Sequence, residues 1–435
     1  MSTLHVRTLH PRTLWRAGHA VERTLEPGVM RLLTPARLKG LHRVPSLPAW
    51  TRRRYAAVKV PWAPFDEVAP AELLSTAGIV RHPELERKAC AEHPLHSFHH
   101  NYGGSVVWSL GKLWRSVIPV GPRLMRAIAH VQQQSREAPA GEQPARTAGV
   151  FTQAVREQAA ALGIAAIGVA DYDATYTFTD LYEGTDLYQG TGPRRVIVCV
   201  LEQNWESTQT LPSVRGERTA LSTNAELMEL AARLAAYIRA AGYPAHAHTT
   251  EGIAVVHHYA VQAGLGQMGF NGQLLTPQAG SRCRLCLITT DAPLVPDAPR
   301  DFGIPRLCEQ CRICVRRCPS GAIPARRAEF RGVEKNKLNL ARCFPVVAQA
   351  SGCSVCMKVC PVQRYGLAAV LDEYKQSGRI LGKDSDELEG YGWPLDGRHY
   401  GPGARPALDA GFFDVPGFGA LADDGQHSVA DNPLM

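Results

Sequence analysis

The sequence has no long uninterrupted apolar run, although 45% of its 435 residues are hydrophobic. No stretch of 18 apolar residues occurs, so a membrane-spanning helix is not expected. The N-terminal part lacks an apolar signal-peptide core and a twin-arginine signal, so we expect no export peptide and a cytoplasmic location. The hydrophobic content is sufficient for a large buried core, so a globular chain of two or three domains is predicted.

The sequence also lacks the cysteine spacing of a zinc ribbon or of a small disulfide-stapled protein. Zinc ribbons use two separated C-x2-C pairs, and disulfide frameworks belong to short secreted chains. Here eight of the twelve cysteines fall in two dense runs that each end in Cys-Pro, within residues 308–319 and 343–361. Such cysteines imply a reducing compartment, which again favours the cytoplasm.

The first run, C-x2-C-x2-C-x3-C-P, has the spacing that binds [4Fe–4S] clusters. Its two-residue gaps let a tight loop point three thiolates at one cluster, whereas the fourth cysteine usually ligates the other cluster. The second run supplies the complement, so two adjacent clusters would form a path for electrons. The predicted ligands are Cys308, Cys311, Cys314 and Cys360 for cluster 1, and Cys318, Cys343, Cys353 and Cys356 for cluster 2.

Charge is distributed unevenly along the chain. Residues 1–60 carry twelve Lys and Arg against two acids, residues 300–345 eleven against four, and residues 361–435 six against twelve. The basic residues near the cysteine runs offset the negative charge of the clusters. They also suit the docking of an acidic electron donor such as a ferredoxin or a flavodoxin, or of a reductase. No aromatic-interleaved basic motif occurs, so nucleic-acid binding is not expected.

Composition divides the chain into four parts. They are a basic, partly helical N-terminal region with a linker (1–148), an α/β domain (149–300), a two-cluster domain (301–365) and an acidic tail (366–435). Residues 105–131 mix Trp, Leu and Ile with Lys and Arg. This pattern predicts either a helix packed on the core or an interfacial helix, which would give residues 1–131 a peripheral membrane contact.

Helical and strand patterns alternate in the second part, which predicts a layered α/β domain. Buried strands are expected at 164–170, 195–201 and 284–290. One helix is expected from Phe151 to Gly163, and another is expected to begin at an Asn224 cap and to end at Gly242. Cys283 and Cys286 are three residues apart on the last strand, so they would face opposite sides of the sheet. We interpret them as buried thiols, with a redox or metal role as the alternative.

The stretch AGLGQMGFNG (263–272) contains G-x-G-x-x-G at Gly264, Gly266 and Gly269. A dinucleotide fingerprint needs a strand before these glycines and a long helix after them, and neither pattern is present. Two interpretations remain. The glycines form a turn that requires positive φ, or they let the backbone approach a large flat cofactor closely.

From HYAVQAGLGQMGFNGQLLTPQAGSRCRLCLITTDAPLVPD through DFGIPRLCEQCRICVRRCPSGAIP, the sequence resembles the corrinoid-dependent reductive dehalogenases. It is also similar to their relative, epoxyqueuosine reductase. The resemblance covers about residues 150–365 and does not extend to 1–148. It implies an α+β protein, in which a nitroreductase-like α/β corrinoid-binding domain precedes a small ferredoxin-like domain. Electrons would pass through two [4Fe–4S] clusters to cobalamin, which would reduce an organohalide or a similar electrophile.

The resemblance also implies site residues. The corrinoid would lie beside the glycine stretch, in contact with Gly264, Leu265, Gly266, Gly269, Phe270, Asn271 and Gly272. Two positions depart from the dehalogenases. Trp205 stands where they often have a tyrosine that donates a proton, which an indole cannot replace, and Phe270 stands where they often have arginine. The candidates for catalytic roles are therefore Trp205, Glu206, His257, His258 and Tyr259, with purely structural roles as the alternative for the histidines and Trp205.

Two other functions fit parts of the sequence. The chain could reduce a modified nucleoside, as epoxyqueuosine reductase does, although the acidic tail offers no basic surface for tRNA. It could also be a ferredoxin-type electron carrier without its own substrate, although such a carrier has no need of the large α/β domain.

Overall fold

The structure is a computed structural model, and it describes residues 119–134, 137–139, 147–173, 193–250, 254–330, 333–336 and 338–408. The predictions for residues 1–118 lie outside the described residues.

An antiparallel sheet forms the centre of the α/β unit. Its strand order is β1-β2-β6-β3, with bounds Ala166–Asp171, Arg195–Glu202, Cys283–Thr290 and Ala245–Ala247. The two central strands pair along their whole length, from Arg195 opposite Thr290 to Glu202 opposite Cys283. The three strands predicted from apolar runs are confirmed to within two residues. These runs do not alternate with polar residues because both faces of the sheet are covered.

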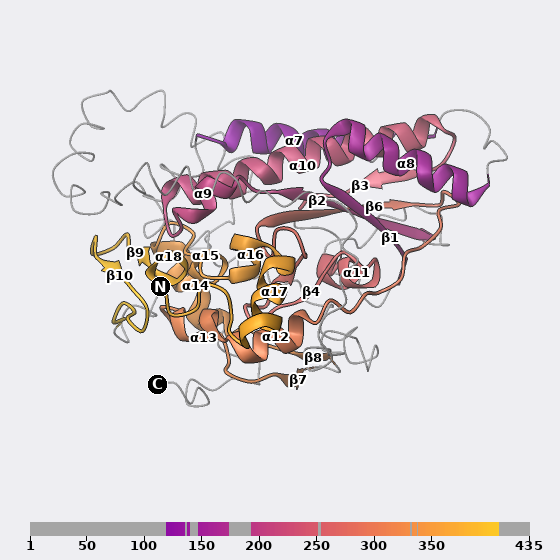
Figure 1. Cartoon of the computed structure of the whole chain (residues 1–435). Coiled ribbons are helices and arrows are strands. Elements are labelled where there is room, and N and C mark those ends of the chain that lie inside the picture. Colours follow the sequence, from indigo (N-terminus) through magenta and orange to yellow (C-terminus); the bar gives the residue numbers. More distant parts are fainter. Residues whose placement is uncertain are drawn as a thin grey trace, which may run out of the picture.

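Helices cover the two faces of the sheet as separate layers (Figure 1). Helices α7 (Gly121–Gln134), α8 (Ala148–Leu162) and α10 (Val214–Ala240) lie on one face, and α11 (Val256–Gln262) lies on the other. Helix α7 buries Ala127 and Val131 in the same core as α10. The part of residues 105–131 that the structure describes therefore packs on the core, as the first of the two alternatives predicted. Cys286 lies in this core and Cys283 in the opposite one, which confirms that their thiols face opposite sides.

The long helix α10 begins ten residues before the predicted cap. Ser213 is its N-cap, and the Ser213 hydroxyl accepts a hydrogen bond from the Gly216 backbone N–H at 3.0 Å. Asn224 lies inside the helix, so the prediction that it caps the helix was wrong. The polar first turns and Gly216 concealed the true start. Gly216 is required there by packing, since a Cβ would lie 2.4 Å from the Leu211 side chain. The predicted end is confirmed, because Gly242 follows the helix with φ 90°.

The capping assignment predicts different stabilities for two alanine variants. Ser213→Ala is expected to lower the free energy of unfolding by about 1 kcal/mol, because the Gly216 N–H loses its acceptor. Asn224→Ala is the control and should change it by less than about 0.5 kcal/mol, because alanine has the higher helix propensity. Chemical denaturation followed by circular dichroism measures both values. Equal losses would contradict the assignment.

A second, mainly helical unit follows the sheet in the chain. Its helices are α12 (Ile304–Cys311), α13 (Ile313–Arg317), α14 (Leu340–Gln349), α15 (Val355–Lys358), α16 (Pro361–Tyr365), α17 (Leu367–Ser377) and α18 (Asp386–Glu389). Two short strand pairs accompany them, β7 (Ala328–Phe330) with β8 (Val333–Lys335), and β9 (Tyr391–Gly392) with β10 (His399–Tyr400). Helix α9 (Trp205–Gln209) of the first unit reaches towards α15 and α16 (Figure 1). Within the described residues, no helix has both the length and the apolar character needed to cross a membrane.

Candidate functional site

Short helices and left-handed turns place the eight cysteines of the two runs. Arg312 adopts φ 52°, so it ends α12 after Cys311 and starts α13 before Cys314. Cys353 lies in a similar turn with φ 44°, just before α15. Non-glycine residues in this conformation are strained and occur mainly where the surrounding structure holds them. In a continuous helix, successive thiols would point in different directions around the helix axis. The turns interrupt the helices between the cysteines and so avoid this arrangement.

The thiols fall into two neighbouring sets. In the first, the charges of Cys308 and Cys360 help to raise the pKa of Cys311, in addition to the larger effect of burial. In the second, the pKa of Cys343 is raised first by burial and then by three neighbouring thiols. The complete sets are Cys308, Cys311, Cys314 and Cys360, and Cys318, Cys343, Cys353 and Cys356. Cys356 and Cys314 lie where the two sets meet.

Burial favours the protonated form of the Cys353 and Cys360 thiols unless a metal binds. It raises the pKa of Cys353 and Cys360 to about 12. Backbone N–H groups oppose this effect, those of Val355 and Ser354 at Cys353 and that of Gln363 at Cys360. Among the described residues, no three His, Cys, Asp or Glu side chains converge closely enough to hold one metal ion. The backbone N–H donors at Cys353 and Cys360 would stabilise these sulfur atoms as the thiolates that bind a cluster.

The glycine stretch forms a hairpin of two short strands, β4 (Gln267–Met268) and β5 (Leu274–Leu275), preceded by α11. Gly264 and Gly272 have positive φ, of 65° and 70°. Gly266 is needed because a Cβ there would lie 2.2 Å from the Leu275 carbonyl oxygen. This arrangement is a turn and not a dinucleotide fingerprint. Gly264 is constrained from outside the hairpin, since a Cβ there would lie 2.6 Å from the Ala298 carbonyl oxygen.

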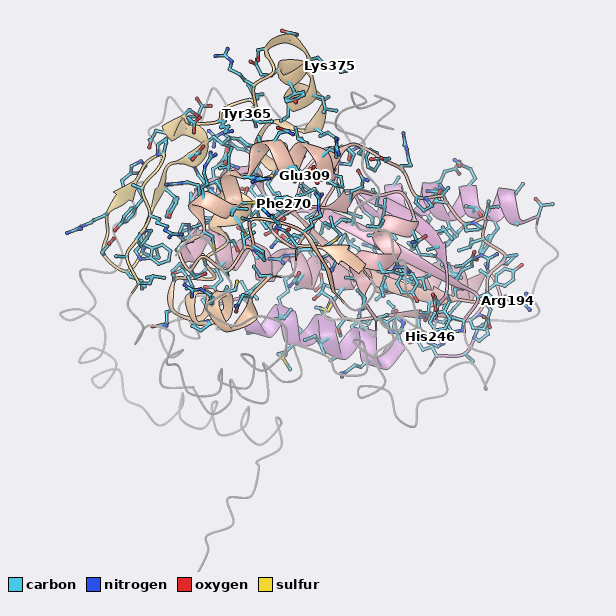
Figure 2. All side chains as sticks on the ribbon, turned by 90° about the horizontal axis from the view of Figure 1, so that it is seen from below. Arg194, His246, Phe270, Glu309, Tyr365 and Lys375 are labelled. Atoms are coloured by element: carbon cyan, nitrogen blue, oxygen red, sulfur yellow. The ribbon has the colours of Figure 1, made fainter. Side chains whose placement is uncertain are left out.

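Phe270 connects this hairpin to the first thiol set. The Phe270 backbone N–H forms a hydrogen bond to the Cys308 thiol, which acts to lower the pKa of that thiol against the larger effect of burial. Its ring is buried, and the Arg327 guanidinium lies 4.7 Å from the ring centroid. A guanidinium therefore lies beside Phe270, although it belongs to Arg327 and not to residue 270 itself. Figure 2 shows Phe270 beside Glu309 at the cysteine motif, far from Arg194 and His246 at the other end of the sheet.

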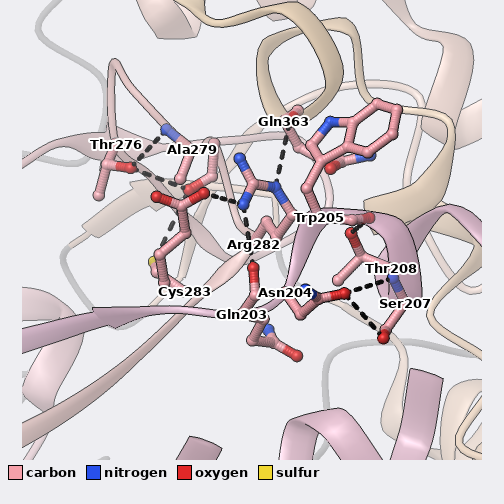
Figure 3. A network of polar contacts seen from close by, with 12 residues as sticks. Gln203, Asn204, Trp205, Ser207, Thr208, Thr276, Ala279, Arg282, Cys283 and Gln363 are labelled. Carbon is pink, nitrogen blue, oxygen red and sulfur yellow. Dashed lines mark hydrogen bonds and ion pairs between the residues drawn. The ribbon is translucent and has the colours of Figure 1, made fainter. Parts of the chain in front are cut away.

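A buried polar network joins the sheet to helix α16 (Figure 3). The Arg282 guanidinium is 1% exposed, forms an ion pair with Glu202 and donates to the Gln203 carbonyl at 3.0 Å. It also donates to the Gln363 carbonyl at 3.4 Å. Gln363 lies in the first turn of α16, three residues after Cys360. Arg282 thereby ties the ends of the central strands β2 and β6 to the segment that carries a cluster cysteine.

Trp205 contacts the same helix. Its Nε1–H donates to the Arg364 carbonyl at 3.3 Å, and the Arg364 guanidinium lies 5.7 Å from its ring. Arg364 also donates to the Gln209 side chain at 2.7 Å. Glu206, on the outer side of α9, is exposed and pairs with Arg215 at 3.4 Å. The geometry therefore gives Trp205 a role at the junction between the two units.

The other candidate catalytic residues lie on α11, apart from α9 (Figure 1). Burial lowers the pKa of His257 and of His258 to about 4, so both imidazoles are neutral at pH 7. The Tyr259 hydroxyl donates to the Asp173 carbonyl at 2.8 Å and accepts from the Asp173 N–H at 3.1 Å. The structure thus brings together His257, His258 and Tyr259, but places Trp205 and Glu206 elsewhere.

Sequence reasoning missed several buried cations of this site. They are Arg282, Arg317, Lys358 and Arg364, each at most 4% exposed. Each lies within four positions of a cysteine, but so do the exposed Arg312 and Arg316, so this spacing does not distinguish the buried cations. A buried cation must find carbonyl or carboxylate partners, because an unpaired buried charge is costly.

Comparison with known proteins defines the class first. Residues 307–364 match the model of the 4Fe-4S dicluster domain. The chain is therefore an iron–sulfur protein with two [4Fe–4S] cluster sites, as the cysteine spacing predicted.

The relatives match a longer part of the chain than the dicluster domain model does. A tetrachloroethene reductive dehalogenase of Desulfitobacterium hafniense is 37% identical over 182 residues, which cover 39% of this chain and 33% of the relative. A solved structure, whose description concerns a reductive dehalogenase and B12-dependent dehalogenation, aligns with TM-score 0.51 and 26% identity, over 57% of this chain and 38% of that one. An epoxyqueuosine reductase of a Synechococcus strain is 34% identical over 110 residues, 24% of this chain and 33% of the relative.

Over the matched part, the chain is a homologue of reductive dehalogenases, and epoxyqueuosine reductase is a more distant relative. This confirms the resemblance predicted from the sequence. The match spans about a third of the length of these curated relatives.

Proposed function

We propose that this protein is a corrinoid-dependent iron–sulfur reductase that reduces an organohalide or a similar electrophile. The observation that carries the proposal is the packing of Phe270 against the cysteines. Phe270 shares one buried cluster with Cys318, Cys308 packs against that cluster, and the Phe270 backbone acts to lower the pKa of Cys308. This packing joins the segment beside which the resemblance places a corrinoid directly to a cluster cysteine. The similarity to reductive dehalogenases, over a longer part of the chain than the dicluster domain, supports the same proposal. We further propose that the α/β unit has a nitroreductase-like fold and that the protein is cytoplasmic.

The ligand assignment is part of the proposal. The two neighbouring thiol sets support cluster 1 on Cys308, Cys311, Cys314 and Cys360, and cluster 2 on Cys318, Cys343, Cys353 and Cys356. Because Phe270 bonds to Cys308, cluster 1 would be the cluster that delivers electrons to the α/β unit.

The chemistry of the side chains beside the glycine hairpin suits a corrinoid. Leu265, Met268 and Gln273 are only half-buried, as are His257 and His258 on the preceding helix. None of them carries a charge at pH 7, since burial keeps both imidazoles neutral. Uncharged side chains of this kind are what a large flat macrocycle contacts. When bound, the corrinoid would supply a low-valent cobalt that gives electrons to the carbon–halogen bond.

The main role of the chain's own residues would be to position the reactants. Supplying protons would be a lesser role. Neutral imidazoles at His257 and His258 can orient a polar group by hydrogen bonding, but they hold no extra proton to donate at pH 7. Tyr259 anchors the end of β1 through Asp173. Trp205 and Arg364 fix α9 against α16 and so hold the α/β unit against cluster 1.

We also propose that an acidic protein delivers the electrons. Arg306, Arg312 and Arg316 are exposed on the helices that carry the cysteines of cluster 1 or connect them. A ferredoxin or a flavodoxin would meet complementary charge there, which speeds encounter and orients the complex.

The corrinoid can be tested directly. The protein is purified anaerobically, reconstituted with iron, sulfide and cobalamin, and desalted, with a sample lacking cobalamin as the control. We expect a base-off Co(II) signal in electron paramagnetic resonance, together with the signals of reducible [4Fe–4S] clusters. Halide release from organohalides would then distinguish a dehalogenase from a nucleoside reductase. Clusters without any retained cobalamin would contradict the proposal and leave a ferredoxin-type electron carrier.

A further inference from the structure

The acidic tail contributes a segment that lies outside the dicluster domain and yet packs on it. We call residues 386–404 the C-terminal strap. It contains α18, β9 and β10. Tyr391 and Trp393 are 3% and 2% exposed, in a core that holds Cys353 of the second thiol set and also Cys311 of the first. The Tyr391 hydroxyl donates to the Arg317 carbonyl at 3.4 Å, next to Cys318 of the second set. The thiols of Cys353 and Cys318 also contribute, after burial, to raising the pKa of Tyr391. The strap therefore lies directly against the cysteines assigned to cluster 2.

Two buried cations from the cysteine runs hold the strap through its backbone. Lys358, between Cys356 and Cys360, donates to the carbonyl of Leu388 at 2.9 Å and to those of Glu387 and Gly390. Arg317 lies immediately before Cys318. It donates to the carbonyls of Tyr400 at 2.7 Å, Glu389 at 3.1 Å and Ala404. Six carbonyls along the strap thus meet two cations that are at most 4% exposed.

Side chains add to this attachment. The Glu389 carboxylate is 1% exposed and lies 3.8 Å from Arg317 and 3.6 Å from Arg316. The Arg317 guanidinium lies 4.9 Å from the centre of the Tyr391 ring. Moving the strap away would break these hydrogen bonds and ion pairs together and would expose the buried Tyr391 and Trp393 side chains to water, which is costly. The strap is therefore a fixed element and not a swinging lid.

We propose that the C-terminal strap is a permanent cover of cluster 2, anchored by Lys358 and Arg317, that excludes water and so holds the reduction potential of this cluster low. Solvent exposure is one of the factors that set the potential of a [4Fe–4S] cluster. Water stabilises the more negatively charged, reduced cluster, so an uncovered cluster 2 would be easier to reduce and a weaker reductant. The inference rests on the ligand assignment of the proposed function.

The anchoring is tested by hydrogen–deuterium exchange of the cluster-loaded protein. In Lys358→Met, amides of residues 386–404 should exchange faster, by on the order of tenfold or more, because the six-carbonyl attachment loses three bonds. Exchange in α10 should stay unchanged. Lys375→Met makes the same substitution at an exposed site and serves as the control. Strap exchange equal to that of the unaltered protein would overturn the anchoring role.

The effect on the cluster needs a variant that does not alter charge near it, because removing the lysine charge would itself lower the potential. Tyr391→Ala opens the cover without changing charge. We expect it to shift one of the two cluster potentials, measured by redox titration with paramagnetic resonance, to a less negative value. Tyr237→Ala, on α10 away from the clusters, should shift neither.

The outcomes separate this inference from the proposed function. Iron content and retained cobalamin are measured in the same samples. An unaltered protein with both clusters but no cobalamin contradicts the proposed function and leaves the strap result intact. The cover is overturned if Tyr391→Ala keeps its iron and shifts neither potential, or shifts both equally. Should Lys358→Met lose cluster 2 while keeping cluster 1, the loss would support an anchor specific to cluster 2.

Discussion

Changing both Cys311 and Cys360 to alanine is expected to remove one [4Fe–4S] cluster and to halve the iron content. The two cysteines lie in different runs of the sequence, but their thiols belong to the same neighbouring set. If each run instead served its own cluster, the same double variant would lose both clusters. Iron and acid-labile sulfide after anaerobic reconstitution, with the spin count of the reduced protein, give the answer.

A matched double variant makes the test symmetric. Cys311→Ala with Cys318→Ala changes two cysteines of the same run, and it is expected to abolish both clusters. Both double variants remove two thiols, so the number of lost ligands cannot explain a difference between them. Iron halved in the same-run variant and lost from the other would show that the ligand assignment is wrong.

The cysteine motif was predictable because its chemistry is local. A cluster requires thiolates from a tight loop, so the spacing of Cys308, Cys311 and Cys314 is enough to indicate the cluster site. The strands were predictable for a similar reason, since covered faces on both sides produce uninterrupted apolar runs. The strand order β1-β2-β6-β3 was not, because apolar runs do not specify their partners.

The start of α10 and the candidate catalytic residues show where local reasoning ends. A serine cap followed by polar residues resembles a loop until Leu211 packs on Gly216. The contacts of Trp205 with Arg364 could not be predicted either, because Arg364 lies far along the sequence; the catalytic role of Trp205 stays a prediction. Likewise, no sequence pattern indicated that Lys358 and Arg317 hold the backbone of the acidic tail, since carbonyl partners leave no signature in residue type.

The buried ion pair of Arg282 is expected to have the largest effect on stability in the α/β unit. Arg282→Met should lower the free energy of unfolding by about 3–5 kcal/mol, because it leaves Glu202 without its cation and two carbonyls without a donor. Anaerobic urea denaturation followed by circular dichroism measures the loss. Arg123→Met is the control, since Arg123 and Glu229 form a pair whose side chains are 43% and 37% exposed. That change should cost at most about 1 kcal/mol.

The position of Arg282 predicts a second effect, which a general loss of stability would not produce. Its bond to the Gln363 carbonyl holds the first turn of α16, which follows Cys360 directly. Arg282→Met should therefore release iron from cluster 1 to a chelator faster than iron from cluster 2, under conditions where the protein remains folded. Equal release from both clusters would mean that Arg282 stabilises the fold without positioning Cys360. Preferential release would make Arg282 the link through which the sheet holds cluster 1 beside the glycine hairpin.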